Sequence, residues 1–223
     1  MNLLALCSGG KDSTYALWLA LKAGHRVKKI IAVLPTEDSL MYHYPNAHLA
    51  ELLEKCTGIP VIAVTAKKGE KEEMDVLKMV LNQQATEGII SGAIASNYQK
   101  RRLDAICREL GLEHFAPLWG RDPAELLTEV LAAGFEIMVV GVAAEGLGEE
   151  WLGRRLDKEA AEEMLKLSKK HGINPCGEGG EYETLVTDAP FFVRRIVVKE
   201  GEKVWKGTHG IYLIKRVELE EKG

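Results

Sequence analysis

The chain has 223 residues, enough for one large domain or for a standard domain with a smaller one. Its net charge of −4 disfavours a surface that wraps nucleic acid, and 46% hydrophobic with 28% charged residues is typical of a globular protein. The apolar run at 2–7 is too short for a signal peptide or a membrane span, so we expect a cytoplasmic protein without a membrane partner.

Strand and helix signals alternate through the first half of the chain. The predicted strands are 2–7, 27–34, 60–64 and 88–91. The predicted helices are 12–23, 47–56, 70–84 and 97–110, with Gly24, Gly58 and Gly111 just beyond three of them. This alternation predicts an α/β fold whose parallel sheet is covered on both faces.

The second half changes character after Pro117, where we expect a domain boundary between 1–117 and 118–223. Helices are predicted at 123–133 and 157–171, with Asp122 and Asp157 as N-caps and a strand at 135–142 between them. After Pro190 only strand signals remain. They predict a meander with strands 191–199, 203–206 and 211–218 and a turn at Gly201-Glu202, hence a smaller C-terminal α+β domain.

Four cysteines stand far apart, without any C-x-x-C pair. This spacing fits neither a zinc ribbon nor a disulfide scaffold, and it predicts buried thiols. The four are Cys7, Cys56, Cys107 and Cys176.

The most informative segment is the turn between the first strand and the first helix. It reads Ser8, Gly9, Gly10, Lys11, Asp12, Ser13. Glycines bring backbone N–H groups close to a ligand, the helix N-terminus adds donors, and Lys11 adds a full charge. Such a turn suits a phosphate or pyrophosphate, and Asp12 could cap the helix or hold Mg²⁺. The segment is neither a Walker loop nor the G-x-G-x-x-G fingerprint.

This segment resembles the pyrophosphate loop of the N-type ATP pyrophosphatases, which cleave ATP between the α- and β-phosphates. The resemblance implies a five-stranded parallel sheet of the adenine-nucleotide α-hydrolase (Rossmann-like) type. It also implies that the six residues at 8–13 bind ATP phosphates, with Lys11 and Asp12 acting in catalysis and Asp12 on the metal.

Three further segments narrow the resemblance to the diphthine–ammonia ligase (diphthamide synthase) family. They are 91–102, 116–122 and 174–184, the last reading Asn-Pro-Cys-Gly-Glu-Gly-Gly-Glu-Tyr-Glu-Thr. The similarity covers nearly the whole chain. It implies ATP-dependent amidation of diphthine on translation elongation factor 2, with release of AMP and pyrophosphate through an acyl-adenylate. Glu183 stands where we expect His in many relatives.

The ends of parallel strands next to the turn are expected to form the nucleotide pocket, because open α/β sheets bind ligands there. With the strand order 3-2-1-4-5, apolar residues would sandwich the purine and polar ones would reach the α-phosphate or the diphthine carboxylate. The residues are Val33, Leu34, Gly92, Ala93, Ile94, Gln99, Arg101 and Arg102.

Glu178, Glu181 and Glu183 place three carboxylates within six residues. Such a density is costly unless cations or solvent are near. Diphthine carries a quaternary ammonium, which favours carboxylates and aromatic faces. We therefore expect a catalytic role for Glu178, Glu181 and Tyr182, with Glu181 and Tyr182, together with Trp119, holding the trimethylammonium or ammonium substrate.

A glutaminase domain does not fit in 223 residues, so we expect free ammonium as the nucleophile. Two alternatives stay open: another adenylating enzyme of the same fold that modifies tRNA or forms a small-molecule amide, and a nucleotide-binding sensor without turnover. A homo-oligomer is expected, in which the strand at 211–217 could pair across the interface.

Overall fold

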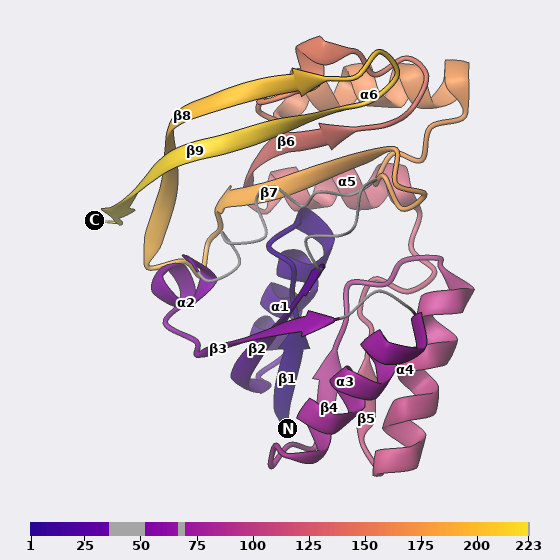
Figure 1. Cartoon of the computed structure of the whole chain (residues 1–223), viewed down its shortest axis with the longest axis vertical. Helices are drawn as coiled ribbons and strands as arrows, with labels where there is room; N and C mark the ends of the chain where they lie inside the picture. Colours follow the sequence, from indigo (N-terminus) through magenta and orange to yellow (C-terminus); the bar gives the residue numbers. More distant parts are fainter. Residues whose placement is uncertain (36–51, 67–69, 223) are drawn as a thin grey trace. The chain divides into compact units, whose positions relative to one another are not determined.

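The computed structural model describes residues 1–35, 52–66 and 70–222 and divides into two compact units (Figure 1). The first unit is Met1–Ser8 with Asp12–Trp119, and the second is Gly9–Lys11 with Gly120–Gly223. The central residues of the glycine turn, up to the first residue of the following helix, thus belong to the second unit, whereas the strand before them and the rest of that helix belong to the first.

A five-stranded parallel sheet forms the first unit, in the order β3-β2-β1-β4-β5. Both the parallel sheet and the expected strand order are therefore confirmed. Its strands are β1 (Asn2–Leu6), β2 (Arg26–Pro35), β3 (Val61–Ala66), β4 (Gly88–Ile90) and β5 (Glu113–Phe115). The short β5 was missed, because its three residues include Glu113 and His114 and give no apolar run.

Helices cover both faces of this sheet. On one face α3 and α4 pack over a buried cluster that joins Leu4 and Ile89 of the strands to Leu81 and Ile106 of the helices. On the other face lies α1, whose Tyr15 and neighbouring apolar residues are buried (Figure 1). The helices are α1 (Lys11–Lys22), α2 (Leu52–Thr57), α3 (Glu70–Asn82) and α4 (Asn97–Leu110).

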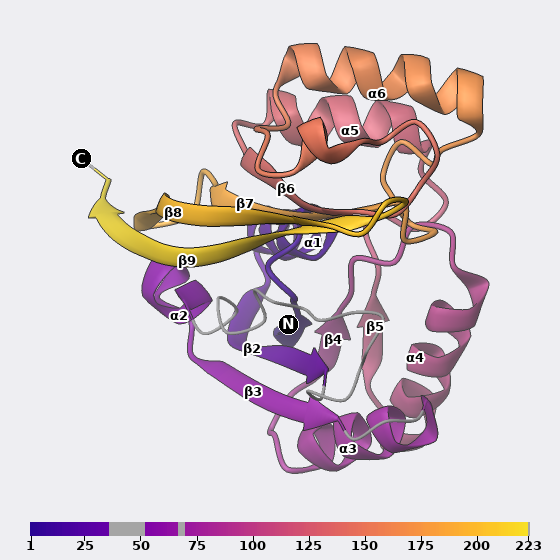
Figure 2. The ribbon, with the colours of Figure 1, turned by 45° about the horizontal axis from the view of Figure 1, so that its top comes forward.

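The second unit is a four-stranded antiparallel sheet in the order β7-β6-β9-β8. Helices α5 and α6 cover one face of it (Figure 2). Its elements are α5 (Pro123–Ala132), β6 (Glu136–Val142), the short 3₁₀ helix η2 (Glu149–Trp151), α6 (Lys158–His171), β7 (Tyr182–Asp188), β8 (Arg194–Trp205) and β9 (Gly210–Glu221).

Local capping signals placed the helix ends well. The carboxylate of Asp122 accepts hydrogen bonds from the first turn of α5, and Asp157 does the same for α6. Ser96 caps α4, and Gly111 ends it with a φ of 67°, the left-handed conformation that glycine adopts without strain. The predicted helix 97–110 is confirmed residue for residue.

The turn expected at Gly201-Glu202 is wrong. Strand β8 runs through both residues to Trp205, and the pairing with β9 only shifts register near Glu200, which is a β-bulge. The chain reverses after Trp205 instead, and Lys206 N–H bonds the carbonyl of His209. Strand β7 was not predicted from the sequence. Of the predicted helix 47–56, residues 47–51 lie outside the described residues.

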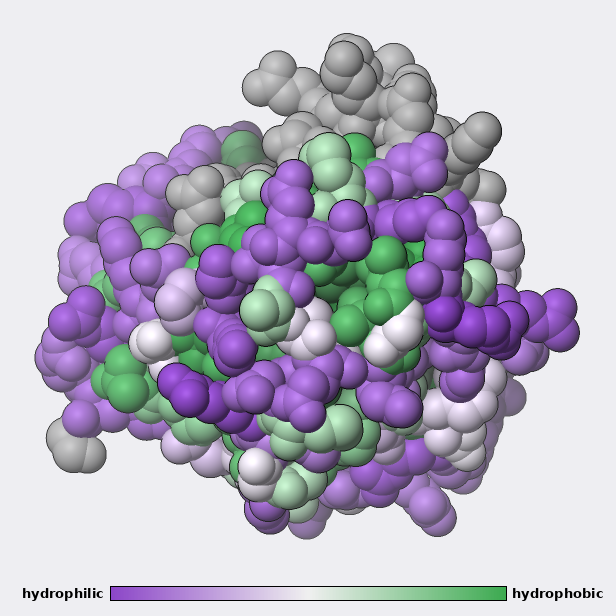
Figure 3. Space-filling view, turned by 90° about the horizontal axis from the view of Figure 1, so that it is seen from below, coloured by the Kyte–Doolittle hydropathy of each residue, from purple (hydrophilic) through white to green (hydrophobic). Residues whose placement is uncertain are grey.

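Few large apolar side chains of the described residues are exposed. On the face seen in Figure 3, hydrophilic residues predominate, with smaller hydrophobic groups between them. Among the described residues, the exposed large hydrophobic side chains are Met1, Met79, Tyr98 and Val193. All four cysteines are buried, as predicted. In the described part of the chain, every helix is too short or too polar to cross a bilayer.

Candidate active site

The glycine turn is closed by its two serines. The backbone N–H of Ser8 donates to Oγ of Ser13 at 3.2 Å, and the two hydroxyls lie 3.3 Å apart. Gly9 between them has a φ of 86°, which a residue with a side chain adopts only under strain. The turn therefore brings its hydroxyls to the start of α1, whose first residues, Lys11 and Asp12, supply charge.

Gly92, just beyond the end of β4, packs directly on the start of α1. A Cβ atom added there would lie 2.6 Å from the backbone nitrogen of Ser13. Only a glycine allows this approach, so the residues expected to hold adenine meet the residues expected to hold phosphate. Ala93 and Ile94, which follow Gly92, are buried.

Lys11 is the most enclosed charged residue of the turn, with 2% of its surface exposed. Its Nζ donates to the carbonyl of Cys176, and its backbone N–H donates to Oγ1 of Thr184 at 3.1 Å. The ammonium also lies 5.0 Å from the centroid of the Tyr182 ring, close enough for a cation–π contact. Within the second unit, two sequence motifs that are 165 residues apart thus form one cluster.

The acidic segment 174–184 is held by its own hydrogen bonds. One carboxylate oxygen of Glu181, Oε1, accepts from the backbone N–H of Asn174 at 3.0 Å. The other, Oε2, is buried and has no hydrogen-bond partner among the described residues. The Tyr182 hydroxyl donates to the carbonyl of Pro175, while Glu178 and Glu183 are partly exposed. A buried acceptor without a donor is costly, and a cation beside it would remove that cost.

The remaining predicted residues lie on β2 and α4 of the first unit. Val33 and Leu34 stand on β2 opposite Val64 and Thr65 of β3. Gln99 and Arg101 of α4 are exposed.

Two cations of α4 contact aromatic rings. The Arg102 guanidinium donates to the Tyr98 hydroxyl at 2.6 Å and lies 4.9 Å from that ring. The ammonium of Lys100 lies 5.4 Å from the ring of Trp119. In the first unit Trp119 is therefore next to a lysine.

Sequence reasoning missed a chain of polar side chains at the end of β4. Oγ of Ser91 lies 2.7 Å from Nε2 of His114, and Nδ1 of that ring lies 2.7 Å from Oδ1 of Asp104. Lys100 donates to the other oxygen of Asp104 at 2.6 Å. The hydrogen bond from Lys100 lowers the pKa of Asp104 most strongly, and the hydrogen bond with His114 lowers it further.

A metal site made by protein side chains alone is not found: the described residues contain no group of three or more His, Cys, Asp and Glu that could hold an ion. At the turn Asp12 offers a single carboxylate in the first turn of α1. Mg²⁺ usually takes one or two carboxylates and completes its shell with substrate phosphates and water. The residues present therefore fit Mg²⁺ that arrives with a nucleotide.

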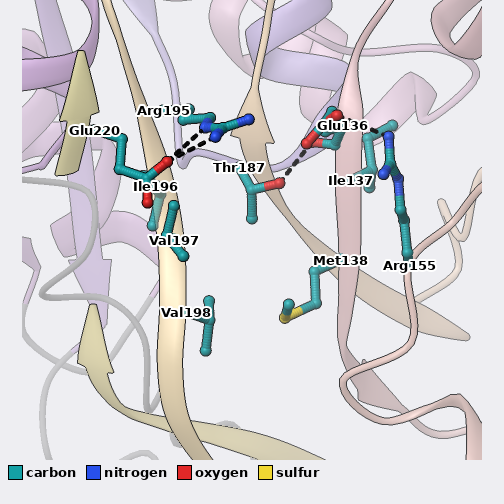
Figure 4. A pocket seen from close by; sticks show the side chains of 10 residues that line it. All are labelled: Glu136, Ile137, Met138, Arg155, Thr187, Arg195, Ile196, Val197, Val198 and Glu220. Carbon is teal, nitrogen blue, oxygen red and sulfur yellow. Dashed lines mark hydrogen bonds and ion pairs between the residues drawn. The ribbon is translucent and has the colours of Figure 1, made fainter. Parts of the chain in front are cut away.

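A pocket of about 370 Å³ lies elsewhere in the second unit, between β6, β7 and β8 (Figure 4). None of the predicted site residues lines it. Its two arginines are paired, Arg195 with Glu220 at 2.6 Å and Arg155 with Glu136 at 2.8 Å. It adjoins the Glu136 end of β6, whereas Tyr182 pairs with the opposite end of that strand. The pocket is thus separate from the cluster around Lys11.

Comparison with protein families gives two matches that together span most of the chain. The diphthamide synthase N-terminal domain matches residues 1–114, and the diphthamide synthase C-terminal domain matches residues 122–219.

Several relatives are about one third identical to this chain over the aligned residues. Diphthine–ammonia ligase of Homo sapiens is 35% identical over 228 residues, which cover 92% of this chain and 85% of the relative. The Mus musculus protein of the same name is 34% identical, with 100% and 94% covered. That of Schizosaccharomyces pombe is 35% identical and covers 92% of this chain but 37% of the longer relative.

Among solved structures, a predicted subunit of tRNA methyltransferase from Methanocaldococcus jannaschii superposes with a TM-score of 0.47 at 18% identity. The match covers 85% of this chain and 98% of that one. This likeness is too distant to bear on function.

Proposed function

We propose that this chain, which belongs to the diphthamide synthase family, is an ATP-dependent ligase that makes diphthamide. Its substrate is diphthine on translation elongation factor 2, and ammonium supplies the nitrogen. A carboxylate oxygen is a poor leaving group. Transfer of AMP to that oxygen makes it a good one, so pyrophosphate leaves first and ammonia then displaces AMP.

The observation that carries this proposal is the cluster around Lys11. The glycine turn suits phosphates, and the family-specific segment 174–184 contacts that same turn through Thr184, Cys176 and Tyr182. A phosphate loop alone is compatible with many reactions of ATP. Its direct contact with the segment that resembles this one family favours diphthamide synthesis over a tRNA-modifying reaction.

The phosphates of ATP would meet hydroxyls, backbone N–H groups and the Lys11 ammonium. That ammonium donates to the carbonyl of Cys176, and it would turn to phosphate oxygens when ATP binds. Mg²⁺ held by Asp12 would neutralise further phosphate charge. These groups stabilise the charge on the leaving pyrophosphate, which accounts for most catalysis in phosphoryl chemistry.

The base and the α-phosphate of ATP would lie along the strand ends of the first unit. Val33, Leu34 and the segment Gly92–Ile94 would contact adenine. Gln99 of α4, with Arg101 or Arg102, would reach the α-phosphate or the diphthine carboxylate.

Glu181 would receive the trimethylammonium group of diphthine. Its buried Oε2 has no hydrogen-bond donor among the described residues, and a quaternary ammonium offers positive charge without any N–H. Tyr182, which was expected to share this cation, instead has its ring against the Lys11 ammonium, and it would act mainly on that residue. Glu178, partly exposed in the same segment, would add negative charge near the cation.

The organisation follows from these roles. Residues 1–117 would bind ATP and residues 118–223 would bind the modified histidine of the elongation factor. We also propose that the protein works in the cytoplasm as a homo-oligomer. Strand β9, which contains 211–217, lies between β6 and β8, so β8 is an outer strand of the sheet and offers a second copy a more available edge than β9 does.

The test is direct. The protein is incubated with diphthine-bearing elongation factor 2, ATP, Mg²⁺ and ammonium. Mass spectrometry then measures the mass of the factor, and the AMP released is quantified. Conversion of one carboxylate to an amide, with one AMP released for each, is the expected result. ATP that binds without cleavage would favour the sensor instead, and AMP formation only with tRNA would favour a tRNA-modifying enzyme.

A further inference from the structure

The hydrogen-bonded chain at the end of β4 has the order of groups that activates a hydroxyl in nucleophilic enzymes. Serine, histidine and aspartate follow one another, each 2.7 Å from the next, and a lysine binds the far oxygen of the aspartate. The amidation steps described above use none of the three residues Ser91, His114 and Asp104.

The direction of the hydrogen bonds follows from the charge of Asp104. Ionised Asp104 only accepts, so His114 carries its proton on Nδ1 and leaves Nε2 as an acceptor. Ser91 must then donate its hydroxyl proton to Nε2. The lone pairs of Ser91 Oγ remain available to a group that can only donate hydrogen bonds.

The position of Ser91 links this chain to ATP chemistry. Ser91 directly precedes Gly92, whose Cα lies against the backbone of Asp12 and Ser13 at the phosphate turn. The exposed fraction is 4% for Ser91 and 5% for the His114 side chain. The end of β4 therefore holds a nearly dry, proton-accepting hydroxyl next to the turn. Only a very small substrate could use it.

We propose that Ser91, His114 and Asp104 form a proton relay that binds ammonium and converts it to ammonia. The proposal rests on the amidation reaction proposed above. Ammonium has four N–H donors and no lone pair, so it cannot attack an acyl-adenylate until it loses a proton. Ser91 Oγ accepts a hydrogen bond from it, and His114 takes the charge that results.

Protons and electrons balance in this step. An N–H bond of ammonium breaks with its electron pair left on nitrogen, the proton joins Ser91 Oγ, and the original hydroxyl proton passes to Nε2 of His114. The imidazolium beside Asp104 later returns this proton to solvent. Ammonia then forms the C–N bond, the bond from the acyl carbon to AMP breaks, and the nitrogen's second excess proton leaves to water.

The experiment compares two nucleophiles in the full-length protein at neutral pH. Ammonium needs deprotonation, whereas hydroxylamine is largely unprotonated at this pH and yields a hydroxamate with a distinct mass. For His114→Gln and Ser91→Ala we expect kcat/KM for ammonium to fall about 100-fold or more, as loss of a general base does. Turnover with hydroxylamine and ATP–pyrophosphate exchange should stay within about threefold of the parent protein.

The control is His25→Gln, a histidine of the same unit just before β2, which should leave turnover with both nucleophiles unchanged. Thermal melting identifies a variant that fails to fold. If His114→Gln fails to fold, Ser91→Ala, which removes only one oxygen, provides the test by itself. Equal losses with both nucleophiles, or no loss with ammonium, overturn the relay. A parent protein that makes neither amide nor hydroxamate overturns the proposed function, and the relay with it.

Discussion

The ammonium of Lys11 lies 5.0 Å from the centre of the Tyr182 ring, although 171 positions separate the two residues in the chain. The same lysine donates to the carbonyl of Cys176. One segment of the second unit thus fixes the position of the charged residue that the phosphate turn supplies. A change in Tyr182 should therefore weaken the binding of ATP, and a change in Lys11 should lower its cleavage much more strongly.

Lys11→Ala should lower ATP-dependent AMP formation by about 100-fold or more, because it removes a charge aimed at the leaving pyrophosphate. It should also cost about 1–3 kcal/mol of folding free energy, since the buried carbonyl of Cys176 loses its donor. AMP release and urea unfolding measure the two effects. The control Lys22→Ala, at the exposed end of the same helix, should leave both unchanged.

Tyr182→Phe and Tyr182→Ala separate the ring from the hydroxyl. Phenylalanine keeps the face that meets Lys11 and loses the bond to Pro175, so KM for ATP should change by less than about threefold. The substitution to alanine removes the aromatic ring as well, so KM for ATP should rise about tenfold. Steady-state kinetics with saturating ammonium gives both values. If alanine raises only the KM for the elongation factor, the ring contacts substrate rather than Lys11.

The phosphate turn could be predicted from sequence because its function depends on local features: two glycines, a lysine and a helix start within six residues. The relay could not, because Ser91 and Asp104 are 23 and 10 positions from His114. The pairing of β4 with β5 brings Ser91 to His114, and the packing of α4 on β5 brings Asp104 there. Serine, histidine and aspartate at such distances look like ordinary surface residues. The contact of Thr184 with Lys11 was hidden for the same reason.

The strand errors have a local cause. Gly201 has the composition of a turn, yet its role is to make room: a Cβ there would lie 2.4 Å from the ring of Tyr212 on the paired strand β9. Glycine in a strand often marks such a close approach or a bulge. Strand β8 alone is therefore predicted from sequence as two shorter strands with a turn between them.

Glu181→Gln should weaken binding of the cationic substrate selectively. The buried Oε2 would lose its negative charge, so KM for diphthine-bearing elongation factor should rise about tenfold while KM for ATP stays the same. Glu159→Gln, an exposed carboxylate in the first turn of α6, is the matched control. An unchanged KM for the factor in Glu181→Gln would place the trimethylammonium group elsewhere.

Gly92→Ala tests the contact between β4 and the phosphate turn. The added methyl group would meet the backbone of Ser13 at 2.6 Å, so the turn must shift. We expect a loss of about 1–3 kcal/mol in stability and at least tenfold weaker ATP binding, measured by calorimetry. Gly141→Ala is the comparison, because its methyl group would meet Glu183 at an ordinary 3.4 Å. Equal ATP affinity in Gly92→Ala and the parent would mean that this contact does not shape the site.

Asp104→Asn tests the charge that sets the direction of the relay. Lys100 and then His114 lower the pKa of Asp104 through their hydrogen bonds, so the ionised form is favoured in the folded protein. The resulting stabilisation is complete above the unfolded-state pKa of about 3.9 and is lost as the pH falls through the lower folded-state pKa. Near pH 7 we therefore expect Asp104→Asn to be less stable by about 1–2 kcal/mol.

This difference should shrink as the pH falls below about 4, because protonated Asp104 no longer differs in charge from asparagine. Urea unfolding of both proteins between pH 7 and pH 3 measures it. The groups that face Asp104 are Lys100 on its own helix and His114 on β5, so Lys78→Ala, which leaves both in place, serves as the control. A stability difference that stays constant across this pH range would show that packing, rather than the charge of Asp104, holds this end of the sheet together.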